Sequence, residues 1–162
     1  MKNLLVVLTM LFSFGSVVAQ EEVPPYKQNK NIPLFTLEQT NKAFYSSSKL
    51  KNTQPSIIMF FSPGCEHCIH QFEDMIKGMK SLKNIQIVMA TYQPIEELAE
   101  FNKKYQVNKY PNIVTGRDVN YFLPPFYHVT NFPYFAFYDK TGKFKSVHEG
   151  NLSVENILKK LK

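Results

Sequence analysis

The spacing of hydrophobic positions changes several times along the chain, and each spacing predicts a different element. Continuous apolar runs at 56–61 and 85–90 predict strands with both faces buried. Between them, residues 65–82 carry apolar side chains three, four and seven positions apart, which predicts one amphipathic helix. Gln71 and Glu73 fall on the polar side of this helix, so we expect both side chains to face solvent.

The patterns around these elements predict further strands and helices. Residues 34–37 alternate as an edge strand does, and the serine-rich stretch 43–54 predicts a short strand and a loop. Pro94 suits the first turn of a second helix, whose glutamates come early and whose lysines come late. Residues 112–115 predict a short strand, and 118–127 a short helix that is broken by two prolines.

The last third of the chain predicts a hairpin and a final helix. Residues 134–138 read as an aromatic strand, 139–142 as a turn, and 143–149 as the returning antiparallel strand. Ser153 then caps a helix over 154–161. The order β–α–β–α–β–hairpin–α predicts an α/β fold, a mixed central sheet with helices on both faces.

The start of the chain has the pattern of a targeting signal. Lys2 supplies a positive charge, a short apolar run follows, and small residues lead up to Ala19. We therefore expect residues 1–19 to be a signal peptide that is cleaved near Ala19, so that the protein is periplasmic or secreted; an uncleaved anchor is the alternative. Residues 20–31, rich in proline and polar side chains, predict a flexible leader, and 32–162 a single domain.

The positive charge of the chain, and the way it is distributed, limit the classes of partner that we expect. The sequence has 19 lysine and arginine residues against 13 acidic ones, a formal charge of +6. Arg117 is the single arginine, and the lysines are scattered. Nucleic acids and anionic membranes are bound by dense basic stripes, so we expect neither as a partner.

The two cysteines of the chain, Cys65 and Cys68, are separated by two residues and follow an apolar run and a Pro-Gly turn. At a helix N-terminus, unpaired N–H groups and the helix dipole favour a thiolate, which is the nucleophile of disulfide exchange. A structural disulfide is the alternative, but a bridge across so short a loop constrains almost nothing. The spacing therefore favours a redox dithiol.

The spacing also suggests a role for each residue of the motif. Cys65, at the exposed helix start, is expected to attack a substrate disulfide, and the more shielded Cys68 to resolve the mixed disulfide. His67 favours the thiolate if it is protonated, whereas Glu66 opposes it. Because the two neighbours act in opposite directions, they leave the reduction potential open.

Three stretches of the chain together resemble one protein family. They are 33–37 (PLFTL), 60–68 (FFSPGCEHC) and 131–143 (NFPYFAFYDKTGK). In this order they resemble the thioredoxin superfamily, and more narrowly the exported TlpA-like thiol-disulfide oxidoreductases of bacteria. The resemblance extends over about 32–162 and implies a thioredoxin-like fold.

The resemblance also implies a substrate-binding loop. Pro133 would be the cis-proline that faces the dithiol, and Phe132 before it would offer backbone groups to a bound polypeptide. From the residues alone, Pro133 could instead be a trans proline that opens a strand. The chain departs from the family at Gly64, often tryptophan, and at Met59 and Gln71, where acidic residues are common. These departures put the family's buried proton relay in doubt.

The leading hypothesis is a thiol-disulfide oxidoreductase without a cofactor or metal. Its expected partners are protein thiols or disulfides and a membrane or periplasmic redox partner, and we expect a monomer. We also consider that Phe126, Tyr127 and Phe132 rim an apolar groove beside the dithiol that receives polypeptide.

Two other functions are kept as alternatives. A Cu(I) metallochaperone could use the two soft thiolates, although such proteins usually space their cysteines by three residues. A thiol peroxidase is suggested by the start of the domain, but the peroxide-binding threonine is missing before Cys65, and Arg117 falls in a loop-like stretch.

Overall fold

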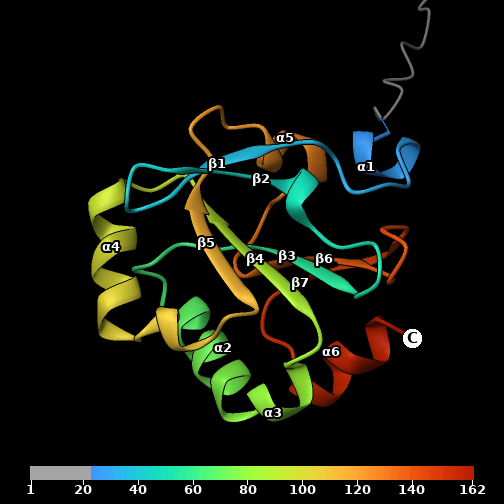
Figure 1. Cartoon of the computed structure of the whole chain (residues 1–162). Helices are drawn as coiled ribbons and strands as arrows, with labels where there is room; N and C mark the ends of the chain where they lie inside the picture. Colours follow the sequence, from blue (N-terminus) through green and yellow to red (C-terminus); the bar gives the residue numbers. More distant parts are fainter. Residues whose placement is uncertain (1–22) are drawn as a thin grey trace, which may run out of the picture.

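Seven strands form one sheet in the computed structural model, which describes residues 23–162; the predicted signal peptide lies outside the described residues (Figure 1). Their order across the sheet is β2-β1-β5-β4-β3-β6-β7. Strands β3, β4 and β5 run parallel, whereas β6 pairs antiparallel with β3 and β7 antiparallel with β6. The strands are β1 (Thr36–Glu38), β2 (Phe44–Ser46), β3 (Ser56–Phe60), β4 (Gln86–Thr91), β5 (Ile113–Arg117), β6 (Tyr134–Tyr138) and β7 (Phe144–Glu149).

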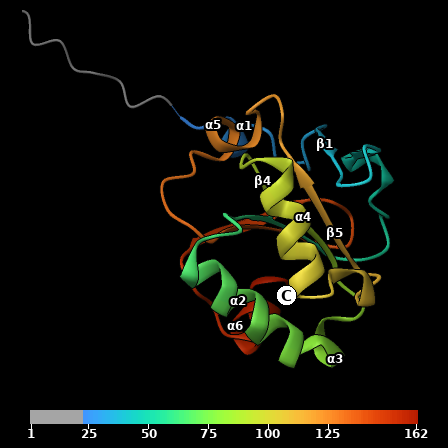
Figure 2. The same cartoon turned by 90° about the vertical axis from the view of Figure 1, so that its left-hand side faces the viewer.

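Helices cover both faces of this sheet, as Figures 1 and 2 show. Alternate residues of β3 enter two separate cores: Ile57 and Met59 pack with α2, α4 and α6, whereas Ile58 and Phe60 pack with α1 and α5. The helices are α1 (Pro25–Gln28), α2 (Glu66–Lys77), α3 (Met79–Leu82), α4 (Ile95–Lys104), α5 (Leu123–Tyr127) and α6 (Val154–Lys160), with 3₁₀ turns η1 (Ser47–Lys49) and η2 (Val107–Lys109). The expected mixed sheet with helices on both faces is confirmed.

The helix predicted over 65–82 is divided in two. Helix α2 ends before Gly78, and α3 follows directly. A Cβ atom on Gly78 would lie 2.6 Å from Cγ2 of Val154, at the start of α6. Glycine therefore permits α6 to approach the backbone at the break.

Two other predictions along the middle of the chain are wrong. Strand β1 is not an edge strand, because β2 pairs with one side of it and β5 with the other. Pro124 and Pro125 do not break a helix; they lie in the first turn of α5, where a backbone N–H is not needed. The edge position belongs to β2.

The leader predicted for 20–31 has structure in its described part. Helix α1 lies there, and Tyr26 is buried, with its ring centroid 5.3 Å from that of Phe144 and 6.0 Å from that of Tyr127. Asn31 forms a bridge with Lys143 beside the hairpin. The aromatic ring of Tyr26 thus fixes this segment to the domain.

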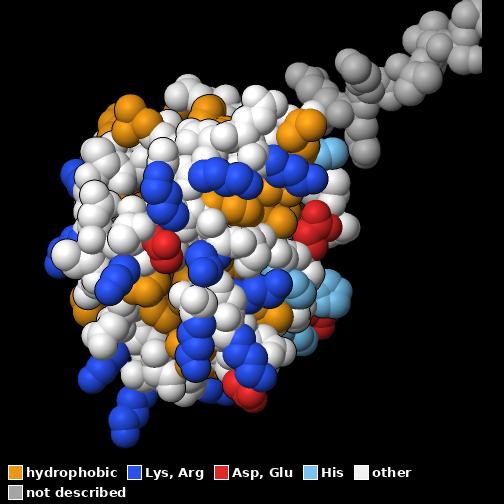
Figure 3. Space-filling model, turned by 90° about the vertical axis from the view of Figure 1, so that its right-hand side faces the viewer, with side chains coloured by type: hydrophobic (Ala, Val, Ile, Leu, Met, Phe, Trp, Pro, Cys, Tyr) orange, Lys and Arg blue, Asp and Glu red, His pale blue; other side chains and the backbone are white. Residues whose placement is uncertain are grey.

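Two properties of the structure bear on nucleic acids and membranes, which were not expected as partners. On the face shown in Figure 3, lysine side chains are distributed from top to bottom. Over residues 23–162, no helix has the length and apolar character that crossing a bilayer requires.

Candidate active site

The dithiol lies at the carboxyl end of the central strand β3. The chain leaves β3 at Phe60, and the N–H of Cys65 donates to the carbonyl of Ser62 (3.1 Å) in a tight turn. Cys65 is the N-cap of α2, with an extended backbone and a half-buried side chain. Cys68 follows in the first turn of α2 and is fully buried. Both are free thiols in this structure.

Burial separates the chemistry of the two thiols. Burial raises the pKa of Cys68 to about 12; the hydrogen bond and charge of Cys65 act in the same direction, and a hydrogen bond from the Ser62 backbone opposes them. The exposed part of Cys65 lies at the helix N-terminus, where an incoming disulfide can reach it. The pair therefore has one accessible sulfur and one sheltered sulfur.

Pro133 lies at the same end of the sheet as the dithiol, where β3 ends and β6 begins. The peptide bond between Phe132 and Pro133 is cis, as the resemblance implied. Antiparallel pairing sets Tyr134 opposite Phe60, so the residues before β6 lie beside the loop that leaves β3. The ring centroids of Phe132 and Phe60 are 5.7 Å apart. The dithiol segment and the segment before β6, about 70 residues apart in sequence, therefore lie side by side at this end of the sheet.

Glu66 and His67, the two residues between the cysteines, are both exposed in the first turn of α2. Within residues 23–162, neither side chain makes a hydrogen bond or an ion pair. The carbonyl of His67 accepts a hydrogen bond from Nδ2 of Asn151 (2.8 Å). No polar contact among the described residues therefore holds either side chain in one place.

Gln71 was expected to face solvent, and this prediction is wrong. Its side chain is 1% exposed. Its Nε2 donates to the carbonyl of Leu152 (3.0 Å), and its Oε1 accepts from the N–H of the same residue. A signal was present in the sequence: Cys68, Gln71 and Met75 are spaced by three and four residues and therefore share the inner side of the helix.

Of the three residues expected to rim an apolar groove beside the dithiol, Phe132 lies there, but Phe126 and Tyr127 do not. Phe126 and Tyr127 belong to the core under α5 and are 8% and 2% exposed. Tyr92, which directly follows β4, lies instead at the surface beside Phe132, with ring centroids 6.1 Å apart. Tyr121 continues this aromatic surface 5.7 Å from Tyr92. Tyr92 could have been found from its place at the end of a buried strand.

A groove borders the other side of the active-site turn. It has a volume of about 460 Å³ and runs between Pro63–Gly64 and the side of α4 that carries Glu97, Glu100 and Lys104. A Cβ atom on Gly64 would meet nothing within 4 Å. The absence of a side chain at Gly64 therefore leaves the groove open next to Cys65.

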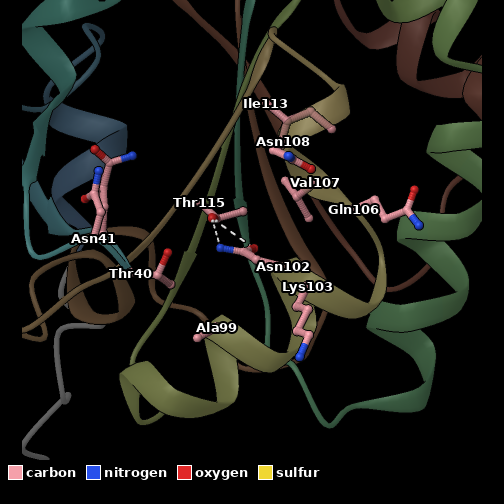
Figure 4. Close-up of a pocket in the computed structure, with 11 residues that line it drawn as sticks. Thr40, Asn41, Ala99, Asn102, Lys103, Gln106, Val107, Asn108, Ile113 and Thr115 are labelled. Atoms are coloured by element: carbon pink, nitrogen blue, oxygen red, sulfur yellow. Dashed lines mark hydrogen bonds between the residues drawn. The ribbon is translucent and has the colours of Figure 1, made fainter.

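A separate polar pocket of about 630 Å³ lies between α4, η2, β5 and the β1–β2 turn (Figure 4). Neither cysteine lines it. Asn102 and Thr115 hydrogen-bond to each other in it, with distances of 2.8 and 3.1 Å. Because no residue of the Cys-x-x-Cys segment lines it, this pocket is separate from the dithiol.

The structure also shows where the residues relevant to a thiol peroxidase and to a metallochaperone lie. Arg117 was expected in a loop-like stretch, but it ends strand β5 and pairs in register with Glu38 and Thr91. Over residues 23–162, His, Cys, Asp and Glu side chains form no cluster of three that could hold a metal ion.

A dithiol at the start of a helix, opposite a cis-proline loop on a mixed sheet, defines a thioredoxin-fold protein. A family model described as the AhpC/TSA family matches residues 29–146. This chain belongs to that family. Searching curated protein sequences gives no match to the chain.

Solved structures show the same fold. A thiol:disulfide interchange protein of the thioredoxin family from Chlorobium tepidum TLS is 19% identical, with a TM-score of 0.67 over 86% of this chain and 96% of its own. A secreted Mycobacterium tuberculosis disulfide oxidoreductase homologous to E. coli DsbE is 18% identical (TM-score 0.65; 78% and 92%). An exposed lipoprotein thioredoxin from Streptococcus pneumoniae is 23% identical (TM-score 0.61; 78% and 96%).

Proposed function

We propose that this chain is a thiol-disulfide oxidoreductase of an exported compartment, which exchanges disulfides with protein substrates through Cys65 and Cys68. The observation that carries the proposal is the asymmetry of the pair: Cys65 is accessible at the N-terminus of α2, and Cys68 is sheltered behind it. An accessible nucleophile with a protected resolving thiol is the arrangement that disulfide exchange needs.

The proposed reaction moves two electrons and two protons. In the reducing direction, the thiolate of Cys65 attacks one sulfur of a substrate disulfide, and the other substrate sulfur leaves as a thiolate and takes up a proton. Cys68 loses its proton and attacks the Cys65 sulfur, which breaks the mixed disulfide and releases the second substrate thiol. The products are a substrate dithiol and the Cys65–Cys68 disulfide. The oxidising direction is the reverse.

Phe132 and Pro133 are proposed to hold the substrate polypeptide beside Cys65. The ladders of β6 begin at Tyr134, so the backbone N–H and C=O of Phe132 stand outside the sheet's own pairing. An extended segment of substrate could add to this backbone as a short strand. The exposed rings of Tyr92 and Tyr121 extend the surface that its side chains would contact.

Export is proposed from the pattern of residues 1–19, and with it a redox partner in the membrane or the periplasm. Mass spectrometry of the mature protein from a periplasmic extract is expected to show Gln20 as its first residue. Full-length protein retained in the cytosolic fraction would contradict export.

The first test is the reduction potential of the Cys65–Cys68 pair, measured by equilibrium with glutathione or dithiothreitol buffers on protein that lacks residues 1–19. A value near about −270 mV indicates a reductant that needs an electron supply, whereas a value near about −120 mV indicates an oxidant. Glu66 is expected to oppose the thiolate of Cys65, and His67 to favour it if protonated, so variants of the two should shift this value in opposite directions. A pair that never cycles, and instead binds copper at a stoichiometric ratio, would overturn the proposal.

A second test identifies the attacking cysteine. The variant Cys68→Ser is expected to accumulate mixed disulfides with substrate proteins, because the resolving thiol is absent. The double variant Cys65→Ser, Cys68→Ser is the control and should trap none. Rapid consumption of hydrogen peroxide by the reduced protein, without exchange with protein disulfides, would favour a thiol peroxidase instead.

A further inference from the structure

Residues 149–152, called here the 149–152 loop, comprise the last residue of β7 and the first three residues after it, and they are bound to the first turns of α2. Nδ2 of Asn151 donates to the carbonyl of His67 (2.8 Å), inside the Cys-x-x-Cys segment. One turn further along, the buried amide of Gln71 pairs with both backbone groups of Leu152. These hydrogen bonds therefore fix the loop to the helix that carries the dithiol.

The same loop is bound to the cis-proline segment on its other side. The N–H of Gly150 donates to the carbonyl of Pro133 (2.8 Å). The carboxylate of Glu149 accepts hydrogen bonds from Oγ1 of Thr130 (2.9 and 2.8 Å) and from Nδ2 of Asn131 (2.9 Å). Hydrogen bonds to a charged acceptor are among the stronger ones in proteins.

The loop is the hydrogen-bonded link between the two halves of the site. Among the described residues, no hydrogen bond runs directly from residues 66–71 of α2 to residues 130–133. The links that start from α2 itself pass through 149–152, whereas the β3–β6 ladder joins only the strand ends next to the two segments, where Tyr134 pairs with Phe60. We infer that this loop sets the separation between Cys65 and the backbone of Phe132, and that Asn151 and Gln71 are its positioning residues on α2.

This inference rests on the proposed function and has a specific consequence. A polypeptide substrate must reach Cys65 and the Phe132 backbone at the same time, so its reaction depends on their separation. A small disulfide meets Cys65 alone. Loosening the loop should therefore slow reaction with a polypeptide and leave reaction with a small disulfide unchanged.

Two probes with the same leaving group separate these effects. One is an extended peptide whose single cysteine is a mixed disulfide with thionitrobenzoate, and the other is free cysteine carrying the same group. Attack by Cys65 forms a disulfide with the cysteine sulfur and releases coloured thionitrobenzoate in both cases. The measured quantity is the ratio of the two second-order rate constants, for reduced protein lacking residues 1–19.

Asn151→Ala is the main variant, because Asn151 is exposed and its loss should not prevent folding. The ratio of peptide to cysteine rates is expected to fall about five-fold, the effect of one hydrogen bond, and the cysteine rate to stay within about two-fold. Asn156→Ala is the matched control, since the side chain of Asn156 makes no hydrogen bond among the described residues. Gln71→Met, which removes both contacts with Leu152 at similar volume, is expected to lower the ratio at least as much.

The outcomes separate this inference from the proposed function. An unchanged ratio in Asn151→Ala, or an equal loss with both probes, overturns the positioning role. A parent chain that reacts with both probes but does not prefer the peptide overturns it as well. A parent chain whose Cys65 reacts with neither probe overturns the proposed function itself.

Discussion

At the scale of single residues, the site depends on how differently two nearby thiols are buried. Cys68 packs against Phe72 and Met75 in the core under the sheet, whereas Cys65 only borders that core. Burial disfavours the charged form of a thiol, so the sheltered sulfur stays protonated until the reaction brings it a partner. The proposed order of events, attack by Cys65 and then resolution by Cys68, is based on this difference.

Alkylation should report the difference directly. Burial raises the pKa of Cys68 from 9.0 to about 12, so its thiolate fraction at neutral pH falls roughly a thousand-fold. In the variant Cys65→Ser, iodoacetamide at pH 8 is expected to label Cys68 at least on the order of a hundred times more slowly in the folded protein than in denaturant, because burial both raises its pKa and shields it from the reagent. Similar rates in the two conditions, followed by mass spectrometry, would show that Cys68 is accessible.

At the scale of elements, the end of α2 shows how one residue type permits a contact between helices. Gly78 lies where Val154 of α6 packs against the backbone. The apolar stripe of 65–82 predicts the buried side of both helices correctly except at Gln71, but the break between them depends on a partner 76 positions away in sequence.

Gly78→Ala is expected to destabilise the protein by about 1–2 kcal/mol, because the added Cβ would lie 2.6 Å from Cγ2 of Val154. The measurement is the free energy of unfolding in urea. Adding Val154→Ala should recover part of the packing cost. Gly64→Ala is the matched control, since its Cβ meets nothing within 4 Å, and its stability should stay within about 0.5 kcal/mol of the parent. Equal losses at both glycines would contradict the packing argument.

At the scale of the whole molecule, a buried pair of tyrosines joins α5 to the sheet. The hydroxyls of Tyr127 and Tyr138 are 2.6 Å apart, and the Tyr134 hydroxyl donates to the carbonyl of Tyr127 (2.8 Å). Burial raises the pKa of Tyr127 well above its ordinary value and that of Tyr138 to about 12. The folded protein therefore holds these protons more tightly than the unfolded chain.

Because the pKa values of these tyrosines are raised in the folded protein, its free energy of unfolding should decrease at high pH. Below pH 10, the ordinary tyrosine pKa, the two hydroxyls contribute fully, and their contribution is lost as pH rises from about 10 toward 12. Each tyrosine should lower the unfolding free energy by about 1.4 kcal/mol per pH unit in this range. Urea midpoints at pH 8 and at steps from 10 to 11.5 measure the slope.

The double variant Tyr127→Phe, Tyr138→Phe tests the origin of that slope. It removes both partners of the hydrogen bond together, so stability at pH 8 should change little. The decrease in unfolding free energy above pH 10 should become shallower than in the parent protein. A slope identical to that of the parent would assign the alkaline loss to other groups.

The sequence by itself determined most of the elements and the cysteine pair on which the proposed function rests. Continuous apolar runs, a period of 3.6 residues and turn residues are local signals, so the central strands, the final helix and the hairpin could be read from them. Two cysteines two residues apart after a strand identified the dithiol. Pro133 and Phe132 came from family resemblance, and the cis bond at Pro133 is present in the structure.

The tertiary structure decided which side chains are buried and which segments meet. Gln71 is polar, yet it lies inside because a backbone 81 positions away satisfies both of its polar groups. Tyr26 fixes the N-terminal segment by packing against residues far along the chain. The loop 149–152 joins the two halves of the site through hydrogen bonds that the pattern of neighbouring residues in the sequence does not predict. Such contacts depend on long-range packing, which a reading of neighbouring residues does not contain.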